Sequence, residues 1–241
     1  MRLPILTYHN IGTPPATARL PKLYVSARSF ERQCRLLRRL GMRGVSLSEG
    51  LAALRAGQAR RLAVLTFDDG YLDNVTDALP ILRECGFTAT CFVVAGHIAD
   101  HNAWDAEQLN VRKPLMSADD IALWRAAGNE IGSHTMTHPR LTVIGDQALA
   151  RELTASKALL ERLTGAPVRH LCYPYGDESA HVREAAAAAG YECAVSTRRG
   201  LARPGDDVFA LPRVSINGDK GLLRFALKVA TPYAALGSKA A

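Results

Sequence analysis

Five times along this chain an amphipathic helical segment stops at or near a glycine, and an apolar extended segment follows. Glycine ends a helix readily because it adopts the left-handed conformation without a steric penalty. The helical segments are 26–40, 74–85, 117–127, 147–163 and 179–189, and they end near Gly41, Gly86, Gly128, Gly165 and Gly190. Helices that end at glycine and lead straight into strands are the repeating unit of parallel α/β proteins, so we predict that architecture.

The extended segments number seven or eight, which is enough to close a barrel. They are expected at 3–8, near Val45, at 62–67 and 87–94, near Ile131, Leu171 and Ala194, and at 209–214. No linker or low-complexity tract interrupts them, so we expect one α/β domain over residues 1–241 with a single barrel-like sheet. An open doubly wound sheet is the alternative, but the chain lacks the G-x-G-x-x-G and Walker-type loops with which such sheets bind nucleotides.

The charge of the chain narrows the class of partner. A formal net charge of +7 would suit an anionic partner such as a nucleic acid, a membrane surface or an acidic glycan. The arginines, however, are spread over predicted helical faces, and aromatic residues make up only 6% of the chain. A nucleic-acid platform therefore lacks its stacking groups, and we predict no nucleic-acid partner.

The number and spacing of the cysteines and the amino-terminal sequence indicate in which cellular compartment the protein is expected. The five cysteines are widely spaced and form no C-x-x-C pair, which predicts a reducing compartment without a disulfide framework. The first apolar run is too short for a secretory signal, and no stretch of about 18 apolar residues occurs. We therefore expect a cytoplasmic protein, or an extracytoplasmic one if a leader precedes this sequence.

Two adjacent acidic residues, Asp68 and Asp69, directly follow the strand-like segment 62–67. Burying an acidic side chain at the end of a strand costs free energy, so carboxylates at such a position suggest a function that requires their charge. Farther along, His134 and His138 are four residues apart and converge if the segment makes one helical turn. One carboxylate and two histidines match the three protein ligands of a catalytic zinc site, which leaves a fourth position for water.

The two segments also carry a family likeness. T-F-D-D-G at 66–70 and S-H-T-M-T-H-P at 133–139 resemble the first two motifs of the polysaccharide deacetylases, carbohydrate esterase family four. The resemblance implies a distorted (β/α) barrel with about seven parallel strands. It also implies one divalent metal ion, zinc ahead of cobalt, nickel or manganese. The implied activity is hydrolytic N-deacetylation of N-acetylglucosamine-type units in a polysaccharide or glycoconjugate.

The resemblance assigns roles to the acidic pair and the histidines: Asp68 is the general base, and Asp69, His134 and His138 are the metal ligands. Successive side chains of an extended segment point in opposite directions, so the two aspartates can face different partners. Amide hydrolysis needs a nucleophilic water, a polarised carbonyl and a proton for the leaving amine. A divalent ion supplies the first two, and Asp68 accepts the proton of the water.

The third motif of the family is altered. Relatives usually have R-x-P-Y-G, whereas this chain has Cys172 where the arginine is expected. The resemblance implies that Pro174 and Tyr175 lie at the substrate and oxyanion positions, with the backbone N–H of Tyr175 as an oxyanion donor. Arg213, at a predicted strand end, is a candidate for the missing positive partner of Asp68, and a surface arginine is an equal alternative. The family's D-x-x-D-W motif is absent.

The general acid of the family is a histidine on a late strand, but no histidine follows His181 here. His9 in Y-H-N-I is similar to the rearranged order of the poly-N-acetylglucosamine deacetylases, in which the acid histidine comes first. The first and last strands of a barrel are neighbours, so the exchange preserves the geometry. His9 is therefore the candidate acid, and a structural core histidine is the alternative. Trp104 either lines the sugar site or anchors its own loop.

Other functions are weighed by particular residues. His134 is followed by Thr135 and not by the glutamate of the zinc-protease motif H-E-x-x-H. The absence of the motif-three arginine leaves open a carbohydrate-binding pseudoenzyme, which a turnover assay would separate from an enzyme. The apolar and basic segment 222–229 is either a membrane-surface helix or the final helix of the barrel.

Overall fold

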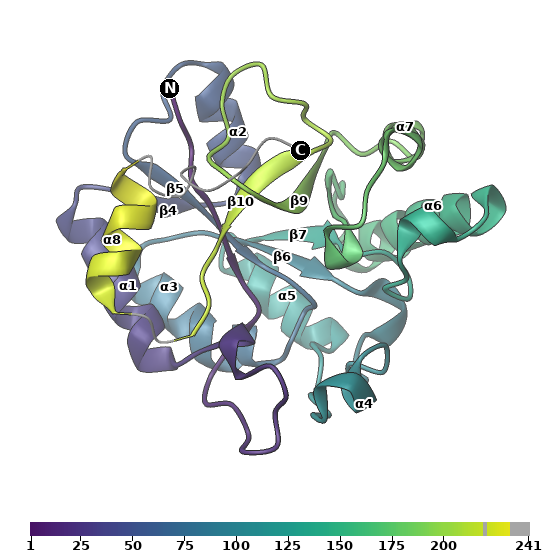
Figure 1. The fold of residues 1–241 in the computed structure, drawn as a ribbon, viewed down its shortest axis with the longest axis horizontal. Coiled ribbons are helices and arrows are strands. Elements are labelled where there is room, and N and C mark those ends of the chain that lie inside the picture. The colour runs from purple at the N-terminus through teal and green to yellow at the C-terminus, as the bar shows by residue number, and fades with distance from the viewer. Residues whose placement is uncertain (219–220, 232–241) are drawn as a thin grey trace.

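The centre of the protein is a parallel sheet, seen in a computed structural model that describes residues 1–218 and 221–231 (Figure 1). Its strands are β1 (Ile5–Tyr8), β4 (Arg43–Val45), β5 (Leu62–Phe67), β6 (Thr90–Val93), β7 (Glu130–Ser133), β8 (His170–Cys172), β9 (Cys193–Arg199) and β10 (Leu211–Ser215). The strands follow the order β1-β10-β9-β8-β7-β6-β5, and β5 pairs again with β1. These seven strands form a closed barrel, and the predicted fold class is confirmed.

The strand expected near Val45 lies outside that ring. This strand, β4, pairs with the first half of β5, where Gly44 lies opposite Ala63. The next strand of the ring, β6, pairs with the second half of β5, from Thr66 onward. The two strands therefore share one edge of β5, and β4 extends the sheet without closing the barrel.

Helices surround the barrel, and the predicted helical segments all appear. The helices are α1 (Ala27–Arg39), α2 (Leu47–Arg55), α3 (Leu79–Cys85), α4 (Ala106–Leu109), α5 (Ala118–Ala126), α6 (Asp146–Thr164), α7 (Ala180–Ala188) and α8 (Leu222–Ala230). A π-helical turn, η2 (Asn74–Ala78), forms the first part of the segment expected as one helix at 74–85. Short 3-10 turns lie at η1 (Pro21–Leu23), η3 (Ala95–His97), η4 (Leu141–Val143) and η5 (Pro174–Gly176), and a small parallel pair joins β2 (Asn10–Ile11) to β3 (Tyr24–Val25).

The core has two layers because alternate residues of each strand point to opposite faces. Leu65 and Phe67 of β5 pack outward with helix residues such as Phe30 and Trp124. Val64, the residue before Leu65, points the other way and belongs to the second cluster, which includes side chains of α2. The barrel is thus filled inside and covered outside by apolar side chains, so its strand ends are held in fixed positions.

A buried polar network lies where β7, β8 and β9 begin. His170 Nε2 is 2.7 Å from Ser48 Oγ, and His170 Nδ1 is 3.0 Å from Cys193 Sγ. Glu130 Oε1 lies 3.3 Å from His170 Nε2. Burial alone would lower the pKa of His170, but the contacts with Cys193 and Glu130 outweigh it and raise that pKa to about 10. This end of the barrel therefore holds a charged histidine that contributes to stability.

The carboxyl-terminal helix α8 packs against α1, as expected for the final helix of the barrel (Figure 1). Phe225 and Val229 of this helix are buried, whereas Leu223 is 77% exposed. Among the described residues, none of the helices combines the length and the apolar character that a membrane crossing requires. Contact of this helix with a membrane surface stays a prediction.

Candidate metal and catalytic site

The chemistry-bearing residues meet at the carboxyl ends of the barrel strands. Asp68 and Asp69 follow β5, His134 follows β7, and His9 follows β1. All parallel strands of a closed barrel end on one rim, which is where barrel enzymes carry their active sites. Residues that are far apart in the sequence are therefore brought within a few ångströms of one another.

Asp69, His134 and His138 form a compact set of potential metal ligands. Asp69 Oδ1 lies 3.5 Å from His134 Nε2 and 3.6 Å from His138 Nε2. Ligands bound to zinc at about 2.0–2.1 Å with tetrahedral angles lie about 3.3–3.4 Å apart, so the observed spacing fits one ion between them. All three side chains are buried. The donor set of two nitrogens and one oxygen suits zinc and other divalent transition metals.

The two histidines differ in protonation. His134 Nδ1 donates to the carbonyl oxygen of Cys172 at 2.7 Å, which orients Nε2 toward Asp69. Burial alone would lower the pKa of His134, but Cys172 and Asp69 hold that pKa well above its ordinary value, so the imidazole is charged. Burial, followed by the charge of His134, lowers the pKa of His138 to about 3, so its imidazole is neutral at physiological pH. Burial alone would raise the pKa of Asp69, but the neighbouring histidines hold it below its ordinary value. The site thus presents the Asp69 carboxylate and a neutral His138, and a bound cation would replace the proton on His134 Nε2.

The loops that carry these ligands have a strained backbone. Asp69, Thr135, His138 and Tyr175 have positive φ angles of 73°, 67°, 63° and 60°. Residues other than glycine adopt this region at a cost, and such residues concentrate at functional sites. Gly176 adjoins Tyr175 with a φ of 70°, and a Cβ atom there would lie 2.0 Å from Thr197 Oγ1. Only glycine fits at that position.

Arg213 holds Asp68 in a two-point ion pair. Its Nη1 donates to Asp68 Oδ1 at 2.7 Å, and its Nη2 donates to Asp68 Oδ2 at 2.8 Å. The guanidinium Nε also donates to the carbonyl oxygen of Ser196, and the arginine is only 2% exposed. Burial by itself would raise the pKa of Asp68, but Arg213 outweighs it and lowers that pKa. The structure therefore places Arg213 where a partner for Asp68 is needed, and not on the surface.

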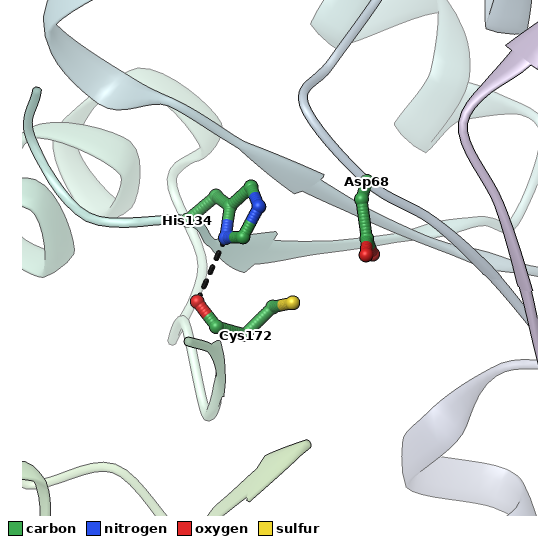
Figure 2. Close-up of side chains that lie close together, drawn as sticks. All are labelled: Asp68, His134 and Cys172. Carbon is green, nitrogen blue, oxygen red and sulfur yellow. Dashed lines mark hydrogen bonds between the residues drawn. The ribbon is translucent and has the colours of Figure 1, made fainter. Parts of the chain in front are cut away.

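Cys172 lies beside this ion pair, and Figure 2 shows it with Asp68 and His134. Its Sγ atom accepts a hydrogen bond from Arg213 Nη2 at 3.2 Å. Asp68, His134 and Cys172 lie close enough to form a second potential ligand set. A cation there would face the Arg213 guanidinium, which already occupies both oxygens of Asp68, so this set is a poor metal site. The favoured set remains Asp69, His134 and His138.

His9 faces the same space from the first strand. Its Nε2 atom is 3.9 Å from Asp68 Oδ2, and its side chain is 26% exposed. The pairing of β1 with both β5 and β10 brings it there. Asn74, which is fully buried in the π-helical turn, donates from Nδ2 to the carbonyl oxygen of His9 at 3.0 Å. The first strand therefore presents a partly exposed histidine next to the buried carboxylate.

Aromatic side chains form a wall beside the potential metal ligands. The Trp104 ring stacks on His138 with a centroid distance of 4.9 Å and an interplanar angle of 29°. Tyr175 meets the same imidazole edge-on at 4.6 Å and is 40% exposed. Pro174, which precedes Tyr175 in η5, is buried. Trp104 thus lies at the site and also anchors its loop, so the two sequence-based alternatives for it are compatible.

Two supporting residues, Glu152 and Asn74, carry no signal in the sequence. Glu152 of α6 accepts hydrogen bonds at Oε2 from the backbone N–H groups of Met136 and Thr137, at 2.8 and 2.9 Å. It therefore holds the loop between His134 and His138 in place. Asn74 holds His9 by donating from its side-chain amide to the carbonyl oxygen of that residue. Neither residue belongs to a recognisable spacing, so only the folded chain reveals these roles.

Comparison with known proteins gives a consistent result. The sequence model of the family described as polysaccharide deacetylase matches residues 55–194. A protein of Bacillus subtilis named as a polysaccharide deacetylase, YxkH, is 29% identical over 218 residues, which cover 90% of this chain and 72% of that protein. The poly-β-1,6-N-acetyl-D-glucosamine N-deacetylase of Staphylococcus aureus is 23% identical over 199 residues, covering 81% of this chain and 68% of the relative.

A solved structure extends the similarity to the whole fold. The crystal structure of a protein of Bacillus anthracis named as a polysaccharide deacetylase superposes with a TM-score of 0.81 and 26% sequence identity. The superposition covers 95% of this chain and 69% of the other. The barrel and its rim are therefore shared over nearly all of the sequence.

Proposed function

Since the chain belongs to the polysaccharide deacetylase family, we propose that it is a metal-dependent hydrolase that removes acetyl groups from N-acetylglucosamine-type units of a polysaccharide or glycoconjugate. The observation that carries the proposal is the convergence of Asp69, His134 and His138 beside an Arg213-bound Asp68. Relatives whose names specify such polymers support the substrate class.

Asp69, His134 and His138 would hold the divalent ion, zinc ahead of cobalt, nickel or manganese. Once bound, such an ion polarises the acetyl carbonyl and makes a water molecule acidic. Asp68 accepts the proton of that water as the general base. Its lowered pKa keeps it ionised at neutral pH, and the two-point contact with Arg213 fixes its orientation.

Two further groups complete the proposed reaction. His9 protonates the leaving amine, since its imidazole faces Asp68 across the rim and remains partly open to solvent. The backbone N–H of Tyr175 donates to the oxyanion that develops on the acetyl oxygen. Trp104 and the Tyr175–Pro174 turn line the sugar position, where aromatic faces stack on pyranose rings.

The alternative is a carbohydrate-binding pseudoenzyme that retains the metal site without turnover. The reason to consider it is Cys172, which stands at the position of the family arginine. Arg213 supplies a guanidinium to Asp68 from β10, so the charge balance of the base does not depend on an arginine at position 172. We therefore favour the hydrolase.

The test is mass spectrometry of N-acetylated oligosaccharides of different linkages after incubation with metal-loaded protein. Loss of acetyl from one linkage class would support the reaction and identify the substrate type. Asp68→Asn, which preserves shape and removes the base, is the matched control and should release none. If the metal-loaded wild type deacetylates no linkage, the pseudoenzyme replaces the hydrolase.

A further inference from the structure

A polar cleft of about 350 Å³ lies between the first turns of α1 and α8, which run side by side at one edge of the barrel (Figure 1). We call it the α1–α8 cleft. It is lined by Ser26, Arg28, Ser29, Arg32, Gln33, Gly221 and Leu222. None of these residues belongs to the proposed catalytic centre, so the cleft is a separate feature of the surface.

Positive charge is concentrated on the α1 side of the cleft. Arg28 and Arg32 are one helical turn apart and therefore share a face of α1. Within residues 1–218 and 221–231, neither guanidinium makes a hydrogen bond or ion pair, and no carboxylate lines the cleft. Like charges at this spacing destabilise a helix slightly. An anion bound between the two arginines would reverse that repulsion.

Gln33 supplies an independent sign of a ligand. It is only 5% exposed, and its Oε1 accepts a hydrogen bond from the Tyr8 hydroxyl at 2.8 Å. Its amide nitrogen has no hydrogen-bond acceptor in the described part of the chain, although the side chain lines the cleft. This donor is therefore available to a ligand in the cleft. An acceptor atom of a ligand in the cleft would satisfy it.

The α8 side adds backbone donors. Gly221 and Leu222 form the amino end of this nine-residue helix, which has no side-chain cap and no acidic residue in its first turn. The first N–H groups of a helix lack intrahelical partners, and they form the positive end of the helix dipole. Gly221 and Leu222 line the same cleft as the two arginines and the glutamine.

We propose that the α1–α8 cleft binds a phosphate group. Two guanidinium groups, an amide donor and helix N–H groups converge there, and a phosphate offers several acceptor oxygens with negative charge. Arginine also matches phosphate geometry through paired N–H donors. The phosphate belongs to a phosphorylated glycan, to a phospholipid headgroup or to free phosphate. The site is independent of the deacetylation chemistry, so either proposal can fail without the other.

The first test is titration of inorganic phosphate into the protein at low ionic strength, followed by calorimetry or NMR. Arg28→Gln and Arg32→Gln should each weaken binding about tenfold, because each removes a charge-assisted contact. Arg39→Gln is the matched control: it removes the same charge from the last turn of α1, outside the cleft, and should leave the affinity unchanged. Wild-type affinity in both cleft variants, or an equal loss in the control, would overturn the proposal.

A second variant and a choice of ligands sharpen the result. Gln33→Glu is nearly isosteric and places a carboxylate in the cleft, so phosphate binding should be lost, and a melting curve reports whether the fold persists. Phosphorylated oligosaccharides and vesicles containing phosphatidylglycerol are compared with inorganic phosphate on the wild type and Arg32→Gln. The ligand whose affinity is highest and falls most with Arg32→Gln identifies the source. If no ligand loses affinity in that variant, the cleft is not a phosphate site.

Discussion

Replacing Arg213 with glutamine should expose how strongly this protein depends on one buried ion pair. In the wild type, both oxygens of Asp68 accept from Arg213, at 2.7 and 2.8 Å, and the two side chains are 5% and 2% exposed. Removing one partner of such a pair leaves an uncompensated buried charge, which costs about 3–5 kcal/mol. At about 2–4 °C per kcal/mol for a chain of this size, the melting temperature should fall by about 6–20 °C.

The pH dependence of that loss gives the sharper measurement. Because Arg213 lowers the pKa of Asp68 in the folded protein, ionisation of Asp68 adds stability above its unfolded pKa of about 3.9, and this stability disappears as pH falls through the lower folded value. In Arg213→Gln, the guanidinium no longer offsets the effect of burial, which raises the pKa of a carboxyl group. The pKa of Asp68 in the folded variant should therefore rise above its value in the unfolded chain. The gap in melting temperature between the two proteins should therefore be large at neutral pH and shrink on acidification.

The pH dependence of catalysis should also reveal the raised pKa of Asp68 in the Arg213→Gln variant. A raised pKa of Asp68 leaves less of the base ionised, so the acidic limb of kcat/KM against pH should move to higher pH in the variant. The double variant Asp68→Asn/Arg213→Gln should be more stable than Arg213→Gln alone, because no buried charge remains, and it should be inactive. An acidic limb that coincides with that of the wild type, together with a melting gap that does not narrow at low pH, would refute the proposed role of Arg213.

Wild-type protein should carry about one divalent ion by elemental analysis, and His138→Ala should lose it; equal metal in both proteins would remove His138 from the ligand set. Asp68→Asn should keep the metal and lose turnover, whereas Asp69→Asn should lose both; near wild-type turnover in the Asp68 variant would exclude it as the base. His9→Gln should lower kcat by about 10²–10⁴ with little change in melting temperature, and an unchanged kcat would return His9 to a structural role. The pKa of His170 is raised to about 10, so its charge adds stability below about pH 6.5 that is lost as pH rises through 10. A wild-type melting temperature that declines over this range, and a flatter profile for His170→Gln, are the expected results; parallel profiles would contradict them.

The barrel could be predicted because its signals are local. Each glycine that ends a helix, and each apolar run that follows, is visible within about ten residues of sequence. The placement of β4 could not be predicted in this way. A strand of three residues has the same sequence pattern inside or outside the ring, and its position depends on where β6 begins to pair with β5.

The candidate site shows the same difference between local signals, which the sequence reveals, and long-range contacts, which it does not. The spacing of His134 and His138 and the adjacency of Asp68 and Asp69 are local, and the sequence alone is enough to indicate a metal site from them. The partner of Asp68 lies 145 residues away, so the sequence offered Arg213 only as one of two equal alternatives. Glu152 clamps the histidine loop through backbone N–H groups, an interaction that requires no particular residue type in the loop and leaves no pattern.

The closed ring explains how Arg213 can reach Asp68 from a strand that is distant in the sequence. Every strand of the barrel ends on the same rim, so a charged side chain can reach Asp68 from several strands without a change of fold. Arg213 reaches it from β10 and contacts Cys172 of β8 through the same guanidinium nitrogen that binds Asp68 Oδ2. The guanidinium therefore fills the space beside Cys172, and a small side chain at position 172 is what the arrangement requires. Cys172 and Arg213 therefore fit together: the small cysteine leaves the space that the guanidinium of Arg213 occupies.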